Sequence, residues 1–237
     1  MRAFWITILL LACSGGVALL LSSPAKPPDV DLAPASTEGE PTLHREPAAP
    51  PSVEPLAQPK PAVNSQSVAI GLDQKINEAT VRPGVISREA DALVADGTFR
   101  IPGAGTKESP YEITWELLVS ASDTFIPRLG ERVIPQRIAL LNGAFVRISG
   151  FIAFPLVTTE SDECLVMLNQ WDGCCIGVPP SPYDAIEVKL AVPADNSKRH
   201  VVRIGTVEGV LHVDPYLVDR WLVGLYTMDH ATLSTEM

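Results

Sequence analysis

Two adjacent cysteines and a closely following run of prolines stand out between residues 169 and 183. Proline fixes φ and lacks an N–H donor, so we expect a loop of one defined shape rather than a strand. The aromatic side chains of the segment have an apolar body that can stack against such a loop. We therefore predict that the functional surface is formed by Trp171, Cys174, Cys175, Ile176, Val178, Pro179, Pro180 and Tyr183.

The two loop cysteines and Cys164 permit several kinds of chemistry. A disulfide from Cys164 to Cys174, or to Cys175, closes a loop of roughly ten residues and is worth about 2 to 3 kcal/mol in the chain-entropy model. Alternatively, all three thiols are reduced, buried and inert. A soft-metal site is a further interpretation, because thiolate and thioether donors favour zinc or copper(I). Its ligands would come from Cys164, Cys174, Cys175, His212 and Met167.

A nucleophilic thiol at Cys175 is the remaining alternative, and it needs a nearby base. Only His200, His212 and His230 are available for that role after the linker-like region. The sequence has no Gly-x-Ser-x-Gly, no His-Glu-x-x-His and no phosphate-loop lysine, and its carboxylates are scattered. We predict no catalytic residue, and an enzyme is the less favoured interpretation.

The charge of the chain excludes one class of partner. It has 28 acidic and 18 basic residues, a net charge of -10, and no cluster of lysine or arginine. Nucleic acid is therefore not an expected ligand. The content of 46% hydrophobic and 19% charged residues is typical of a globular protein.

Alternating apolar residues predict the strands that position the loop. In residues 142–155, Val146, Ile148 and Ile152 share one face, and Gly150 is expected at a bulge or bend. Further strands are expected at 164–168, 184–192, 200–212 and 221–228. In the third of these five strands we expect Ile186, Val188, Leu190 and Val192 to point inward and Glu187 and Lys189 to point outward.

Two short helices are expected before the strands. Residues 87–97 resemble a helix with Ser87 as N-cap and Gly97 just past its end. A second helix of one or two turns should follow Thr114, with Trp115 and Leu118 available for packing. The predicted fold is therefore mainly β: a small antiparallel sandwich, or a barrel of the oligonucleotide/oligosaccharide-binding (OB) type, with one or two short helices.

Three segments, Ile113–Leu118, Leu141–Leu156 and Gly173–Pro182, resemble a family of exported bacterial proteins catalogued only as a domain of unknown function. The resemblance implies a location in the cell envelope, a small β-domain and, for some members, association with zinc-related ABC transport systems. The family motif Ala-Cys-Ile-His-Val-Pro-Pro places its cysteine on Cys175, its alanine on Cys174 and its histidine on Gly177. Without that imidazole, the metal site of the motif lacks one donor.

The first residues predict how the chain is located. Residues 3–21 carry no charge and are long enough to span a bilayer as a helix. We expect a single-pass anchor in the inner (cytoplasmic) membrane with the C-terminal part in the periplasm. A lipoprotein signal with Cys13 as the acylated residue and a cleaved signal peptide are the alternatives.

The expected organisation has three parts: an anchor or signal segment (1–21), a disordered Pro-rich linker (22–66) and an exported β-domain (67–237). Eleven of the 22 prolines lie in the linker. We predict a membrane-tethered, periplasm-facing binding or accessory module, linked to metal-ion handling or to an ABC transport system. A thiol enzyme using Cys175 and a structural protein that binds an envelope partner are the alternatives.

Overall fold

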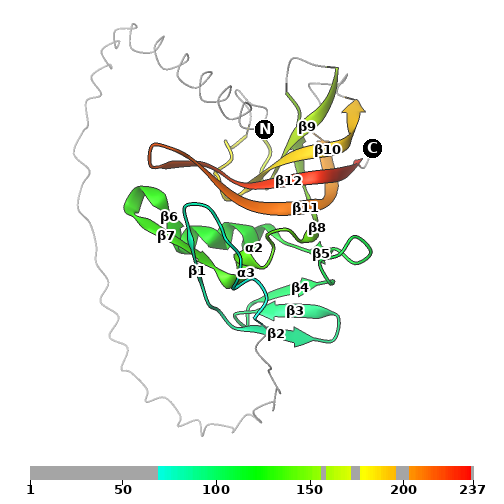
Figure 1. The fold of residues 1–237 in the computed structure, drawn as a ribbon. Coiled ribbons are helices and arrows are strands. Elements are labelled where there is room, and N and C mark those ends of the chain that lie inside the picture. Colours follow the sequence, from blue (N-terminus) through cyan, green and yellow to red (C-terminus); the bar gives the residue numbers. More distant parts are fainter. Residues whose placement is uncertain (1–68, 156–158, 172–176, 196–202, 236–237) are drawn as a thin grey trace, which may run out of the picture. The chain divides into compact units, whose positions relative to one another are not determined.

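The computed structural model of the protein describes residues 69–155, 159–171, 177–195 and 203–235. These residues are mainly β with few short helices, as predicted (Figure 1). No helix in these four ranges is long and apolar enough to cross a membrane. The predicted anchor, residues 3–21, and the predicted linker, residues 22–66, lie outside the described residues.

Short elements make up the first half of the described chain. In order they are β1 (Thr80–Arg82), β2 (Ile86–Glu89), β3 (Ala92–Ala95), β4 (Phe99–Pro102), β5 (Tyr111–Glu112), α2 (Trp115–Val119), η1 (Ser120–Asp123), β6 (Phe125–Ile126), η2 (Pro127–Leu129), β7 (Glu131–Pro135) and α3 (Gln136–Ala139). Long strands follow: β8 (Phe145–Ala153), β9 (Glu160–Met167), β10 (Ala185–Asp195), β11 (Arg203–Val218) and β12 (Trp221–Thr235).

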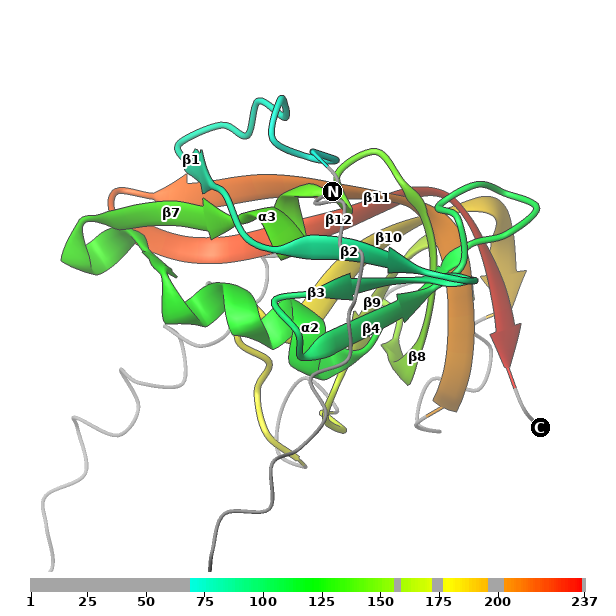
Figure 2. The same ribbon diagram turned by 90° about the horizontal axis from the view of Figure 1, so that it is seen from below.

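The segment predicted as a helix at residues 87–97 is instead the β2–β3 hairpin and the start of a turn. β2, β3 and β4 form an antiparallel sheet, which Figure 2 shows from below. Asp96 and Gly97 have φ values of 53° and 68°, so the chain turns back between β3 and β4. An Asp-Gly pair is a strong hairpin signal because both residues tolerate positive φ, and here it outweighs the helix-favouring composition.

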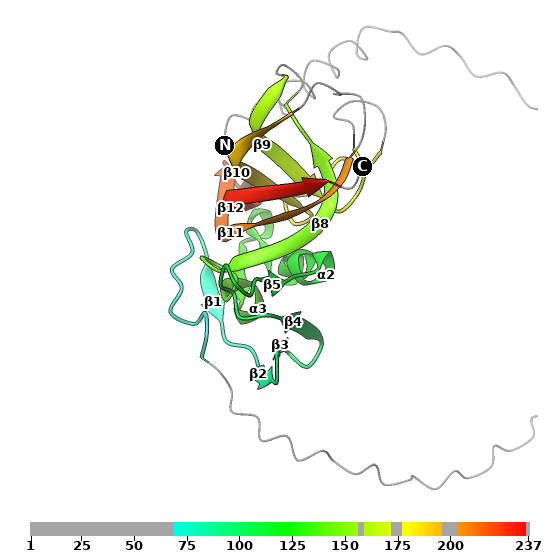
Figure 3. The same ribbon diagram turned by 90° about the vertical axis from the view of Figure 1, so that its right-hand side faces the viewer.

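The small β2–β3–β4 sheet is part of the same core as the long strands. Its buried residues Ile86, Leu93 and Ile101 belong to the main hydrophobic cluster. α2 and α3 lie between this sheet and the long strands (Figures 1 and 3). Arg137 of α3 connects the helices to the small sheet, because it donates to Asp96 Oδ2 in the β3–β4 turn and to Ser120 Oγ in η1, each at 2.8 Å.

The helix predicted after Thr114 is confirmed as α2. The Leu117 N–H donates to Thr114 Oγ1 at 3.3 Å, the side-chain N-cap that a threonine at this position provides. Trp115 and Leu118 are buried, and Trp115 Nε1 donates to the Ser149 carbonyl at 2.8 Å. The helix is thereby fixed to β8.

β8 pairs with strands on both of its sides. The largest sheet has the order β11-β12-β10-β9-β8-β5, and β11 also pairs with β8 along Arg203–Val210. Figure 3 shows the long, curved β8 beside β11 and near β9. The register with β11 is continuous through Gly150, so the predicted bulge is absent there. A Cβ at Gly150 would lie 2.6 Å from the Met167 carbonyl oxygen, and glycine therefore allows this close approach.

We predicted a purely antiparallel sheet, but the largest sheet is mixed. β12 lies between β10 and β11, antiparallel to β11 but parallel to β10, with Ile186 opposite Tyr226. The two-residue turn at Asp219 and Arg220 makes β11 and β12 a hairpin, so their mutual direction is fixed. The parallel pair arises because the second arm of this hairpin, and not the first, lies next to β10.

Most side chains of β10 follow the predicted alternation. Ile186, Val188 and Leu190 are buried. Val192 is exposed instead, because the register with β9 shifts between Lys189 and Ala194. Glu187 points away from the main core, as predicted, but it is only 8% exposed and not a solvated surface residue.

Candidate functional site

We call residues 169–183, with the two adjacent cysteines and the prolines, the Cys-Pro loop. Its described part extends the β9–β10 hairpin. The Leu168 N–H donates to the Asp184 carbonyl at 3.0 Å, and the Val178 N–H donates to the Gln170 carbonyl at 3.1 Å. Trp171 and Gly177 form an isolated bridge beyond them. Cys174, Cys175 and Ile176 of the predicted functional surface lie outside the described residues.

Gly177 occupies a position that admits no side chain. Its φ is 95°, and a Cβ there would lie 1.8 Å from the Gln170 carbonyl oxygen. In this backbone conformation a side chain is excluded both by φ and by space, so only glycine fits at this position.

The proline part of the loop is held by local hydrogen bonds and by one aromatic side chain. The Ser181 N–H donates to Asp184 Oδ1 at 2.6 Å. Tyr183 packs against the main core, and its hydroxyl donates to the Phe125 carbonyl at 2.6 Å. Burial raises the pKa of the Tyr183 hydroxyl. Tyr183 thus fixes the loop to β6, whereas Val178 and Pro179 are exposed.

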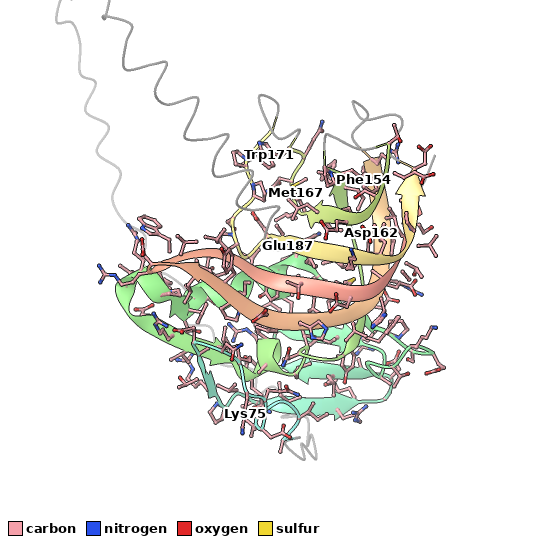
Figure 4. All side chains as sticks on the ribbon, turned by 45° about the horizontal axis from the view of Figure 1, so that its top comes forward. Lys75, Phe154, Asp162, Met167, Trp171 and Glu187 are labelled. Atoms are coloured by element: carbon pink, nitrogen blue, oxygen red, sulfur yellow. The ribbon has the colours of Figure 1, made fainter. Side chains whose placement is uncertain are left out.

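Trp171 lies at the edge of a second hydrophobic cluster, on the side of the sheet opposite the main core. We call this the outer-face cluster; its buried members are Leu165, Met167, Ala185 and Val223. Trp171 and Tyr216 pack against it and are partly buried. Figure 4 shows Trp171 and Met167 close together above Glu187.

A polar cavity of about 420 Å³ continues the outer face beyond the cluster. It is lined by Lys75, Asn77, Asn142, Glu187, His212, Val213, Asp214, Tyr216, Gly224, Tyr226, Thr227 and Asp229. A cross-strand row joins cluster to cavity: Leu165 is opposite Glu187, Glu187 opposite Thr227, and Thr227 opposite His212. Three strands each contribute one carboxylate to the cavity: Glu187 from β10, Asp214 from β11 and Asp229 from β12.

His212 is a wall residue of this cavity. Its Nε2 lies 3.4 Å from Asp229 Oδ2, an ion pair when the imidazole is protonated. Tyr226 contributes to the floor, where it is fully buried and its hydroxyl donates to the Leu118 carbonyl at 2.8 Å. Burial raises the pKa of this hydroxyl well above its usual range. Tyr226 thus remains a neutral hydrogen-bond donor.

The structure does not bring together the predicted metal ligands that it describes. Cys164 is a free, buried thiol in the main core, opposite Val188. His212 and Met167 lie on the outer face. Burial raises the pKa of Cys164 to about 12, which disfavours the thiolate that a metal or an electrophile requires. In the described residues no group of three or more His, Cys, Asp or Glu side chains is arranged to hold a metal ion.

The structure has Cys164 as a free thiol, and its predicted disulfide partners Cys174 and Cys175 lie outside the described residues. The cavity was missed by the sequence reasoning. Lys75 and Asn77 come from a segment far from the strands, and Asp214 and Asp229 lie on different strands. Its residue on β10, Glu187, was expected only as an outward-facing side chain like Lys189 on the same strand.

Comparisons with known proteins identify no function. No family model matches the sequence, and no curated protein matches it. A DUF3299 family protein from Pseudomonas aeruginosa PAO1 has a distantly similar structure, with 18% identity and a TM-score of 0.37. The match covers 54% of this chain and 97% of that chain.

Proposed function

We propose that the protein is a membrane-tethered binding module whose ligand lies on the outer face of β9, β10, β12 and β11. The observation that carries this proposal is the continuity of the outer-face cluster with the polar cavity. Tyr216 borders both, and Glu187 lies next to Leu165 in the row that joins them. A ligand with an apolar group beside a positively charged group fits such a surface.

The acidic side chains of the cavity favour a ligand that carries a positively charged group. Glu187, Asp214 and Asp229 line it, against Lys75 and His212. Glu187 is largely removed from water, where a charged partner interacts more strongly than at an open surface. The apolar part of the ligand would lie on Trp171 and Tyr216, which are partly buried and pack against the outer-face cluster.

We further propose an OB type of fold for the five long strands. The order β8-β9-β10-β12-β11, the return pairing of β11 with β8 and the parallel pair β10–β12 support this proposal. OB folds use the face of their second and third strands for binding, which corresponds to β9 and β10 here. Binding of nucleic acid needs a positively charged groove, whereas the carboxylates on this face are negatively charged and would repel the phosphates.

The proposed location rests on the sequence. Residues 3–21 would anchor the chain in the inner membrane, and residues 22–66 would act as a tether. The metal and thiol-enzyme interpretations depend on Cys174 and Cys175. The only cysteine among the described residues, Cys164, is a poor ligand and nucleophile because of its raised pKa.

Calorimetric titration of the full-length protein in lipid nanodiscs tests the proposed ligand class, with empty nanodiscs as the blank. The probes are hexylamine, hexanol and hexanoate, which share one apolar tail. We expect the order amine, alcohol, carboxylate in affinity. Glu187→Gln should weaken hexylamine binding by about tenfold and leave hexanol unchanged, since it removes one partly desolvated charge pair.

Two further variants separate the two ends of the site. Trp171→Gln should weaken the binding of the amine and of the alcohol alike, because Trp171 lies at the apolar end of the site. Asp162→Asn is the matched control, since this carboxylate lies at the other end of β9 and pairs with Lys189. Equal affinity for amine and carboxylate, or equal effects of Glu187→Gln and Asp162→Asn, would contradict the proposal.

A further inference from the structure

Exposed apolar side chains gather at the tip of the β11–β12 hairpin. Trp221 is 61% exposed and Val218 41%, and the two are opposite each other across the turn. The Arg128 guanidinium lies over the Trp221 ring, 4.9 Å from its centroid, which places η2 and the 63% exposed Leu129 beside the hairpin. We call Leu129, Val218 and Trp221, with Arg128 and Arg220, the hairpin-tip patch. Figures 1 and 2 both show the hairpin tip beside the β6–β7 region.

These side-chain types fit the boundary between water and lipid. Tryptophan has an apolar body and one N–H donor, and it is enriched where membranes meet water. Arginine covers apolar surface with its stem while its guanidinium binds phosphate. Asp219 and Glu131 are also exposed at this end of the molecule, so the charges balance. Apolar contact, and not attraction to anionic lipid, is therefore the main contribution.

The small size of the patch favours a lipid surface over a second protein chain. Stable protein interfaces use about 20 to 30 residues on each side. The hairpin-tip patch has only five residues, gathered around the turn that ends the β11–β12 hairpin. For a tethered domain, however, the effective concentration of lipid is high, so a weak contact is sufficient.

We propose that the hairpin-tip patch rests on the surface of the bilayer in which residues 3–21 anchor the chain. This inference depends on the membrane tether of the proposed function. Contact at the tip would hold the domain near the membrane in one orientation. Trp171, and Glu187 of the cavity, lie outside the β11–β12 hairpin and would remain available to ligands.

Photocrosslinking of the full-length protein in nanodiscs tests this inference. p-Benzoylphenylalanine replaces Leu129 or Trp221 in two variants, and Val85, which is 61% exposed in the β1–β2 connection, in the control. After irradiation, mass spectrometry measures the yield of lipid adduct at each position. We expect yields at positions 129 and 221 that exceed the yield at 85 by at least about tenfold. Discs of zwitterionic and of anionic lipid should give similar yields.

Each outcome distinguishes the inference from the proposal on which it depends. Equal lipid adducts at all three positions, adducts to a second protein chain, or none in protein that is incorporated into discs would overturn the patch inference and leave the tether intact. Failure of the full-length chain to enter discs would overturn the tether, and the patch inference with it. Because the three positions are exposed, each variant should keep the urea midpoint of the parent protein.

Discussion

Raising the pH above 9 should lower the free energy of unfolding of the protein, because the thiol of Cys164 is buried. Burial raises the pKa of Cys164 from 9.0 to about 12 in the folded protein. Between these values the unfolded chain releases the thiol proton and the folded protein keeps it. The unfolded state then binds fewer protons, so the free energy of unfolding falls as pH rises, by at most about 1.4 kcal/mol per pH unit. Below pH 9 this contribution is fully present and constant.

Urea denaturation of the full-length protein and of Cys164→Ala, from pH 7 to 11, measures the effect. Tyr111, Tyr183 and Tyr226 also have pKa values raised by burial, so the parent protein alone does not isolate the thiol. The difference in the free energy of unfolding between the parent protein and Cys164→Ala isolates the contribution of the thiol. We expect this difference to be constant up to pH 9 and then to decrease by about 1 kcal/mol per pH unit, since only the parent carries the thiol.

Alkylation by iodoacetamide, resolved by peptide mass spectrometry, checks the same pKa independently. The thiolate is the reacting species, so a pKa of about 12 in place of 9.0 lowers the rate of folded Cys164 about a thousandfold at pH 8. In urea without reductant Cys164 should react fully. Rapid labelling of the folded protein would refute the burial argument. A disulfide from Cys164 to Cys174 or Cys175 in the denatured, unreduced protein would refute the free thiol.

Four substitutions test the packing of the fold through urea midpoints of the full-length protein. Gly150→Ala should lower the free energy of unfolding by about 2 kcal/mol or more, because its Cβ would overlap backbone atoms. Gly97→Ala, with φ of 68° and no atom within 4 Å of the added Cβ, should lower it by about 1 kcal/mol. Equal losses would contradict the steric argument. Tyr226→Phe should cost about 1 to 2 kcal/mol, since it leaves the Leu118 carbonyl without its donor; an unchanged midpoint would show that this hydrogen bond is dispensable. Arg137→Met should cost about 1 to 3 kcal/mol by removing the link between three elements; no loss, or a loss abolished by 1 M salt, would reduce the link to a surface ion pair.

Local patterns in the sequence predicted the elements whose structure depends on local rules. Thr114 identified the start of α2, and the alternation around Val146 and Ile148 identified β8. The segment from Ser87 to Gly97 misled the prediction because its Ala, Glu and Leu content favours a helix, while pairing with β4 decides the structure. Propensity is a weak prior that tertiary pairing overrides.

The cavity depended on information that no local pattern contains. The carboxylate of Glu187 becomes part of a site only when β12 brings Thr227 beside it and β11 brings His212 beside Thr227. Which strand lies next to β10 is a property of the topology and not of the strand sequences. The parallel register of β10 and β12 was therefore the missing information for the site as well as for the fold.

The position of β12 between β10 and β11 also governs how the domain is completed. Until residues 221–235 are in place, β10 and β11 each present an unpaired edge, and unpaired edges are templates for association with other chains. The pairing of β11 with β8, which joins Val210 to Phe145, likewise brings together parts of the chain that are distant in sequence. A chain that is halted or cut before β12 would therefore be prone to aggregate.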